Sequence, residues 1–146
     1  ITAGDSNMGL KENIAAVRAD LDTHAQNFFV CFFKKYPDNQ KLFRDFIGKD
    51  PESLRASAKF QSHTRKVVKM VLDVVERSGE GNNLKKDVNI LVKMPQHGNI
   101  SLERYKEVLG TLLIFLEQTL GSSYDKPAWE AVGHALLGTL QEAGLK

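Results

Sequence analysis

Apolar side chains recur at spacings of three and four along most of the chain, and this helical period most constrains the fold. One stripe in this pattern is formed by Phe60, His63, Val67 and Val71. Such a stripe is typical of an amphipathic helix that buries one face. Alternating apolar and polar residues and tight hairpin turns, which mark strands, are nearly absent. The sequence therefore predicts an all-α chain, and it sets a histidine on a face that a helix normally buries.

Proline and glycine divide this period into seven or eight helices with short connections. Pro37 ends one helix and begins a short turn, and Asp50 with Pro51 is typical of a helix start. Ser101 is the expected cap of a strongly apolar helix that Gly121 ends. The longer helices are expected at about 10–21, 28–36, 58–78, 84–92, 102–120 and 127–143.

Size and charge exclude several classes of protein. The 146 residues are enough for one domain with a hydrophobic core. A net charge of +2, without a dense basic block, gives no reason to expect a nucleic-acid partner. The longest apolar run, FFVCFF at 28–33, is far shorter than the roughly 20 residues that span a bilayer. We therefore expect neither nucleic acid nor a membrane as a partner.

The single cysteine, Cys31, indicates the compartment. It lies in the most apolar stretch of the chain, which predicts a buried small hydrophobic residue. One cysteine allows no disulfide within the chain, and the N-terminal residues do not resemble a secretory signal. We expect a cytoplasmic protein.

Two of the four histidines form a possible pair. His24 and His134 are interpreted as ordinary boundary or surface residues. From His63 to the break at Gly79 the chain rises about 24 Å as a helix, and the next helix returns about 20 Å to His97. If the two helices are antiparallel, the imidazoles of His63 and His97 lie at similar heights and can face one another.

The pair is compatible with more than one role. A structural zinc site needs about four nitrogen or sulfur ligands, which two histidines and one cysteine do not supply. A haem brings its own four nitrogen ligands and needs only one from the protein. The alternatives are a satisfied core histidine at His63 and a helix-terminal histidine at His97. Pro95 and Gly98 flank His97 closely and leave its ring at a frayed helix end.

The spacing of these residues resembles the globin family. In YPDNQKLFRDF, Pro37 is followed six residues later by Phe43, which precedes His63 by 20 residues and His97 by 54. Trp129 follows in DKPAW. The resemblance covers residues 9–146 as a single globin domain, with 1–8 as an N-terminal extension. The stretches KYPD, AKFQSHT, MPQH and AGLK are most similar to polychaete-worm globins of the dehaloperoxidase-haemoglobin type.

The resemblance implies a three-over-three globin fold, with seven to eight helices around one haem b (iron protoporphyrin IX). His97 then resembles the proximal iron ligand, and His63 the distal hydrogen-bond donor. Lys93 and Pro95 depart from the common globin pattern, so we expect His97 to bond a backbone carbonyl near Leu91. The other residues that the resemblance places around the haem are Phe29, Phe43, Val67, Leu91, Ile100, Tyr105 and Val108.

Two functions follow from this resemblance. The first is reversible O2 binding for storage or transport, in which neutral His63 donates a hydrogen bond to the bound ligand. The alternative is peroxide-dependent oxidation of halogenated phenols, with His63 as the catalytic acid and base. Arg65 lies on the wrong side of its helix to assist, and Arg44 reaches at most the pocket mouth. Nitric-oxide or sulfide chemistry, sensing and a helical bundle without haem are further alternatives.

The expected partners are O2 and other small haem ligands, together with a small aromatic substrate in the peroxidase case. No acidic side chain lies within a helical turn of His97, which disfavours strong peroxidase chemistry because a carboxylate partner makes the proximal imidazole electron-rich. We expect the chain to act as a monomer or a homodimer.

Overall fold

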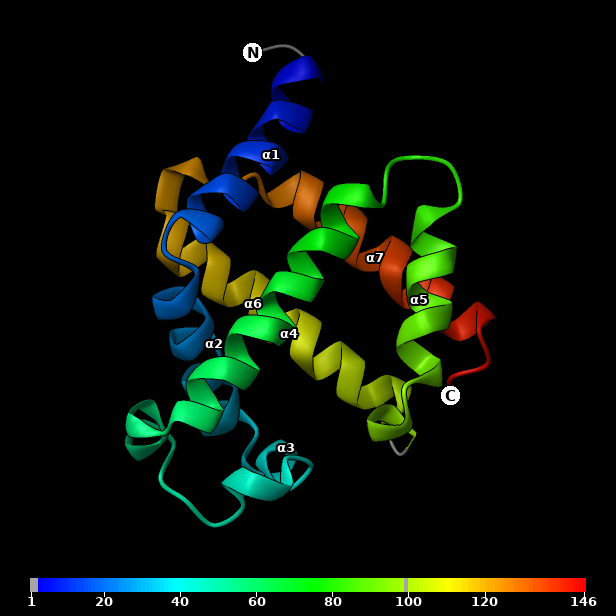
Figure 1. Cartoon of the computed structure of the whole chain (residues 1–146). Helices are drawn as coiled ribbons and strands as arrows, with labels where there is room; N and C mark the ends of the chain where they lie inside the picture. Colours follow the sequence, from blue (N-terminus) through cyan, green and yellow to red (C-terminus); the bar gives the residue numbers. More distant parts are fainter. Residues whose placement is uncertain (1–2, 99) are drawn as a thin grey trace.

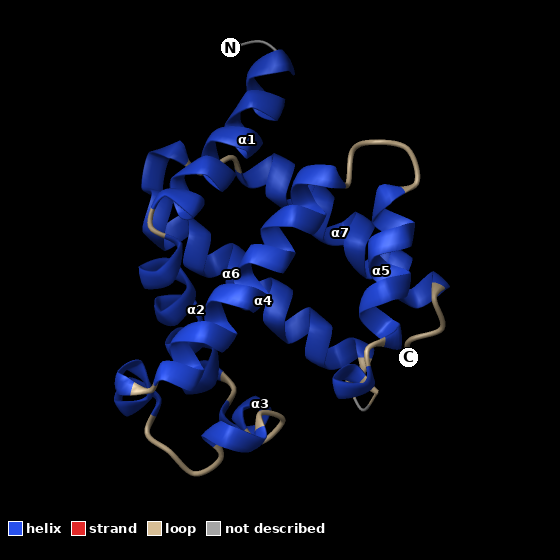
Figure 2. Cartoon of the chain, in the orientation of Figure 1, coloured by secondary structure: helices blue, strands red, loops and turns tan. Residues whose placement is uncertain are grey.

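The computed structural model describes residues 3–98 and 100–146 (Figure 1). Within these ranges the chain forms helices and loops and no strand, so the predicted all-α class is confirmed (Figure 2). The α-helices are α1 (Ala3–Ala19), α2 (Leu21–Lys35), α3 (Pro37–Gln40), α4 (Ala58–Arg77), α5 (Asn83–Lys93), α6 (Leu102–Leu120) and α7 (Lys126–Glu142). Four short 3-10 helices join them: η1 (Arg44–Phe46), η2 (Pro51–Ala56), η3 (Pro95–His97) and η4 (Gly121–Ser123).

Side-chain caps begin three of the long helices where the sequence signals lie. The side chain of Ser57 accepts a hydrogen bond from the backbone N–H of Phe60 at the start of α4. Ser101 caps α6 and Asp125 caps α7 in the same way. Each such cap stabilises a helix by about 1 kcal/mol. Local side-chain chemistry therefore fixes the residues at which α4, α6 and α7 begin.

The boundaries of the first two helices differ from the prediction, which placed these helices at about 10–21 and 28–36. The first helix begins at Ala3 and ends at Ala19, and α2 begins at Leu21, so that Leu21 and His24 belong to α2. Neither proline nor glycine marks the break between the two helices, so the sequence pattern placed it several residues too late. Cys31 also differs from the prediction, because it is only partly buried.

The helices form two layers, with α1, α4 and α5 on one side and α2, α6 and α7 on the other (Figure 1). Helix α2 is central to the core, because it contacts α4, α6 and η2. Its wide apolar face is buried, as the sequence predicted from the four phenylalanines Phe28, Phe29, Phe32 and Phe33. Their rings also contact one another, mostly edge to face. Two of these rings, Phe29 and Phe32, also line the candidate functional site.

Buried Asn13 ties the first helix to the last. Its side-chain amide donates to the carbonyl of Ser123 at 2.7 Å. Its side-chain oxygen accepts from the indole N–H of Trp129 at 3.0 Å and from the backbone N–H of Asp125 at 2.9 Å. These bonds satisfy buried polar groups that would otherwise destabilise the fold by about 1–3 kcal/mol each.

The predicted N-terminal extension of residues 1–8 is partly outside the described residues. Ile1 and Thr2 are not described, and α1 begins at Ala3. The boundary of the extension stays a prediction. In the ranges that are described, each helix is too short or too polar to serve as a membrane span.

Candidate functional site

A cavity of about 470 Å3, here called the main cavity, lies among α2, α4, α6, α7 and the segment that runs from α5 into η3. Its volume and largely apolar walls are typical of small-molecule and cofactor sites. The structure brings together around it every site residue expected from the sequence. These nine residues are Phe29, Phe43, His63, Val67, Leu91, His97, Ile100, Tyr105 and Val108. Their roles toward a cofactor remain predictions.

His63 is held inside a group of aromatic rings. Its ring centroid lies 5.9 Å from that of Phe29, 5.2 Å from Phe43 and 5.7 Å from Phe46, each in an edge-on arrangement. Within the described part of the chain, its Nε2 is buried and has no hydrogen-bond partner. A buried polar atom of this kind is costly unless a ligand satisfies it. We interpret Nε2 of His63 as a group whose hydrogen-bond partner is a ligand bound in the main cavity.

The surroundings of His63 keep it neutral. Burial lowers the pKa of His63 below its ordinary value, and the positive charge of Lys66 lowers it further. The carboxylate of Asp45 opposes this shift only in part. A neutral imidazole carries one N–H donor and one acceptor nitrogen. His63 can therefore either donate a hydrogen bond into the cavity or accept a proton from a molecule there.

His97 has the arrangement that a metal-binding histidine requires. It ends η3, which Pro95 begins. Its Nδ1 lies 2.9 Å from the carbonyl oxygen of Leu91. Because a carbonyl only accepts, the proton is on Nδ1 and the lone pair of Nε2 is free for a metal. The expected bond to a carbonyl near Leu91 is confirmed, and it fixes the orientation of the ring.

Tyr105 is a further polar residue of the cavity wall. Among the described residues its hydroxyl has no partner, and its oxygen is buried. Burial raises the pKa of Tyr105, so the group stays a protonated O–H at neutral pH. Tyr105 and His63 thus supply two neutral donors in a cavity whose other walls are mostly apolar.

Three basic side chains and one acidic side chain line the main cavity: Arg44, Lys59, Arg104 and Asp45. Lys59 is 3.9 Å from the carboxylate of Asp45 and Arg104 is 3.1 Å from that of Glu107, whereas Arg44 has no ion pair among the described residues. As expected, Arg44 lies at the cavity and Arg65 does not line it, since Arg65 pairs with Asp22 on the surface at 2.8 Å. An anionic group beside Arg44 would meet complementary charge. In the described ranges, no three His, Cys, Asp or Glu side chains lie close enough together to hold a metal ion by themselves.

Sequence reasoning missed one residue of the histidine environment. Phe46 is buried and contacts both His63 and Phe60, at ring distances of 5.7 and 5.4 Å. The available signal was its apolar side chain three residues after Phe43, in a segment with no helical period. His24 and His134 lie away from the cavity lining, His24 against Phe115 and His134 on the surface.

Acid is expected to weaken folding through His63. The unfolded chain takes up a proton near pH 6.5, the ordinary value, whereas burial lowers the pKa in the folded chain. Between the two values the unfolded chain binds more protons, so the free energy of unfolding falls as the pH drops below about 6.5. Urea unfolding of the wild type and His63→Leu at several pH values measures this. The wild type should lose more stability on acidification, and parallel pH profiles would contradict the assignment.

Comparisons with known proteins identify the family and the fold. The family model for Globin matches residues 26–140. A globin of Nerita albicilla is 26% identical over 142 residues, which cover 92% of this chain and 87% of that protein. Globin CTT-V of Chironomus thummi piger is 31% identical over 117 residues, 77% of this chain and 70% of that protein. Ferric Aplysia limacina myoglobin has the same fold, with a TM-score of 0.82 at 18% identity over 99% of both chains.

Proposed function

This chain belongs to the globin family, and from that premise we propose that its main cavity holds haem b and that it binds O2 reversibly. One observation carries the proposal. His97, oriented by the carbonyl of Leu91, lines the same cavity as neutral, unpartnered His63. His97 would then hold the iron, and His63 would contact a small molecule bound in the cavity.

The residues of the main cavity fit haem in three respects. Nε2 of His97 offers the single protein ligand that haem needs. The apolar walls, which include Phe43 and Val67, suit a flat hydrophobic ring. Arg44 lines the cavity without an ion pair among the described residues, so it suits a carboxylate of the cofactor.

Haem supplies an iron at which O2 binds, and the side chains determine how tightly. Neutral His63 would donate a hydrogen bond to a small molecule bound there, worth about 1.5–3 kcal/mol if that molecule carries negative charge. Phe29, Phe43 and Val67 restrict water around it. Together they favour reversible binding over oxidation of the iron.

The second candidate is a haem peroxidase that oxidises halogenated phenols. Neutral His63 supports it, because an imidazole without a partner can take a proton from peroxide and return it. The resemblance of KYPD and MPQH to annelid dehaloperoxidase-type globins also supports it. Against it, His97 bonds a carbonyl and not a carboxylate, and Arg65 pairs with Asp22 outside the cavity. We therefore place O2 binding first.

One preparation of the haem-loaded chain tests the two functions. We expect a reversible O2 spectrum that survives many cycles of binding and release. We expect peroxide turnover on a halogenated phenol to be slow in the same preparation. Rapid steady-state turnover together with fast oxidation by O2 would support the peroxidase and contradict the O2 carrier.

Further parts of the proposal rest on the sequence. A cytoplasmic location rests on the single Cys31 and not on the fold. A globin domain at 9–146, with residues 1–8 as an extension, rests on the spacing of the globin positions. A monomer or a homodimer is proposed, and sedimentation of the haem-loaded chain distinguishes them.

A further inference from the structure

A groove of about 350 Å3, here called the α6–α7 groove, lies on the surface between the last two long helices. Its middle is apolar, with Leu113 and Leu137 half-buried and glycine at Gly110 and Gly133. Ile114 stands beside them and is 44% exposed. A contiguous apolar patch of this kind marks an interaction surface, whereas a single exposed apolar side chain does not.

The residues that α6 contributes to the groove have a spacing that is the same in both chain directions. Lys106, Gly110, Leu113 and Glu117 are separated by four, three and four residues, which is the spacing of a coiled-coil seam. The midpoint of this series falls between residues 111 and 112. A second α6 that crosses there in antiparallel orientation therefore pairs Lys106 with Glu117 and Gly110 with Leu113. A two-fold axis forms each of these pairs twice.

The apolar pair of this series is complementary in size. Gly110 is exposed, and no other atom lies within 4 Å of the place where its Cβ would be. Leu113 is half-buried, so part of its side chain is available to a second molecule. The open space at Gly110 can therefore receive Leu113 of a second copy, and the missing side chain lets the two helices approach closely.

One end of the groove is acidic. Three carboxylates lie near Tyr124 at this end: Glu117, Asp125 and Glu130. Burial, followed by the negative charge of these groups, raises the pKa of Tyr124 to about 12. Lys126 also lines this end, but it lies 3.9 Å from Glu117, and both side chains are more than half exposed. The single ammonium therefore does not balance the carboxylates.

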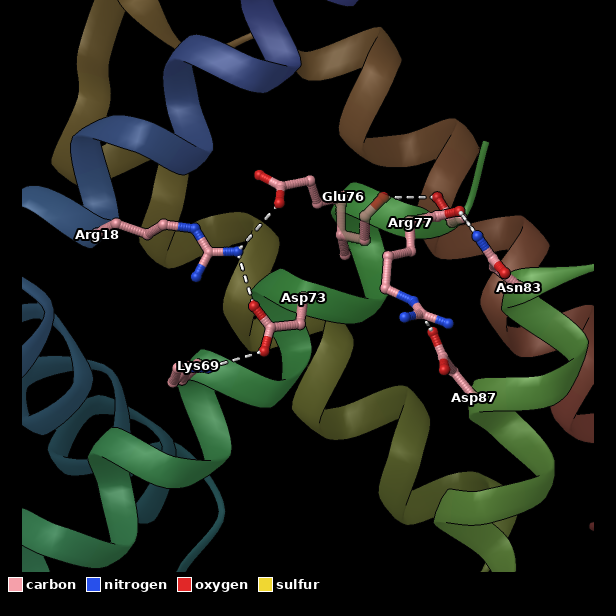
Figure 3. A network of polar contacts seen from close by, with 9 residues as sticks. Arg18, Lys69, Asp73, Glu76, Arg77, Asn83 and Asp87 are labelled. Atoms are coloured by element: carbon pink, nitrogen blue, oxygen red, sulfur yellow. Dashed lines mark hydrogen bonds and ion pairs between the residues drawn. The ribbon is translucent and has the colours of Figure 1, made fainter. Parts of the chain in front are cut away.

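The other end of the groove carries Lys106, about 16 Å along α6 from the acidic end. Lys106 is exposed and has no ion pair among the described residues. The charged residues of α1, α4 and α5 in Figure 3 differ, because they are paired within the chain. There Arg18 lies 2.8 Å from Asp73, and Arg77 lies 3.1 Å from Asp87. The groove thus has opposite charges at its two ends that the chain itself does not pair.

We propose that the α6–α7 groove is the interface of a homodimer, in which α6 of one copy lies antiparallel to α6 of the second. The two-fold axis places the basic end of each groove on the acidic end of the other, so the surface is its own complement. The four helices then form a bundle with the apolar patch inside. This inference goes beyond the proposed function, because it does not depend on what the main cavity binds.

Sedimentation velocity of the haem-loaded chain over a range of concentrations tests the dimer. We expect the wild type to change from monomer to dimer as its concentration rises. Ile114→Lys should raise the dissociation constant of the dimer about tenfold, because the two-fold axis brings two ammonium groups into the apolar contact. Ile90→Lys is the matched control, since Ile90 is an exposed helical isoleucine of α5 that does not line the groove. This variant should dimerise as the wild type does.

Exchanging the two charges of α6 tests the antiparallel register. Lys106→Glu and Glu117→Lys should each weaken the dimer about three- to tenfold, because each places like charges opposite one another at two symmetric contacts. The double variant restores opposite charges at both contacts, so its dissociation constant should return toward that of the wild type. Both effects should diminish at high salt, because these side chains are exposed.

Three outcomes would overturn the proposal. A wild type that stays monomeric at every concentration would show that the groove does not bind a second copy. A dimer that Ile114→Lys leaves intact would place the interface elsewhere. A double charge variant weaker than either single variant would exclude the antiparallel pairing. Haem uptake is followed separately in the absorption spectrum, so a failure of the proposed function is distinguished from a failure of the dimer.

Discussion

Replacing His97 by glycine is expected to abolish stable haem retention. His97 is the proposed protein ligand, and its Nδ1–H bond to the carbonyl of Leu91 at 2.9 Å keeps the Nε2 lone pair available. Without the imidazole only apolar contacts and the cavity-lining Arg44 would hold the cofactor. Added imidazole should restore binding, because the deletion leaves space for a free ring beside Leu91. The haem absorbance that remains after gel filtration, with and without imidazole, measures the effect.

The control for this variant is His134→Gly. His134 lies on the exposed side of α7, so its replacement makes a similar change in composition away from the main cavity. A glycine within a helix costs about 1 kcal/mol, which should leave haem binding intact. If His97→Gly retained haem as well as His134→Gly does, His97 would not be the ligand.

Replacing His63 by leucine is expected to accelerate O2 dissociation at least about tenfold, since a hydrogen bond to a charged ligand is worth about 1.5–3 kcal/mol. Burial lowers the pKa of His63, so the ring is neutral at pH 7 and can donate from Nε2. Phe29, Phe43 and Phe46 hold this ring in place. Leucine keeps much of the volume but removes the donor. Stopped-flow displacement of O2 by CO measures the dissociation rate.

His63→Gln distinguishes the hydrogen bond from packing. Glutamine restores a donor at the same position, so its dissociation rate should lie between those of the wild type and His63→Leu. His134→Leu, at an exposed site, should leave the rate unchanged. Equal rates in the wild type and His63→Leu would mean that the imidazole does not contact the bound ligand.

Much of the fold is encoded locally and was therefore predictable. Capping by Ser101 and the proline at Pro37 act within a few residues, and the helices begin and end accordingly. The break at Asp20 was not predictable in this way, because Asp20 makes no side-chain cap bond and no proline or glycine marks it. The two helices pack against different partners, α1 mainly against α7 and α2 mainly against α4, and such long-range contacts are not visible in the local sequence.

The residues of the candidate site also divide into those that the sequence predicted and those that it did not. Its two histidines were predictable because few residue types do this chemistry, and because the spacing of Phe43, His63 and His97 resembles that of the globin family. Phe46 was missed, because its contact with His63 depends on how the loop after α3 folds back over α4. A loop has no period, so its sequence does not specify which way its side chains point.

The sequence by itself therefore determined the helical class, most helix boundaries and which two histidines were candidates for a shared site. Caps, prolines and apolar periods act within single helical turns, so they can be recognised in the amino-acid sequence alone. Only the tertiary structure decided that the rings of Phe29, Phe43 and Phe46 enclose His63, and that its Nε2 is buried without a hydrogen-bond partner among the described residues. These features join segments distant along the chain, and their distances follow from how whole helices pack.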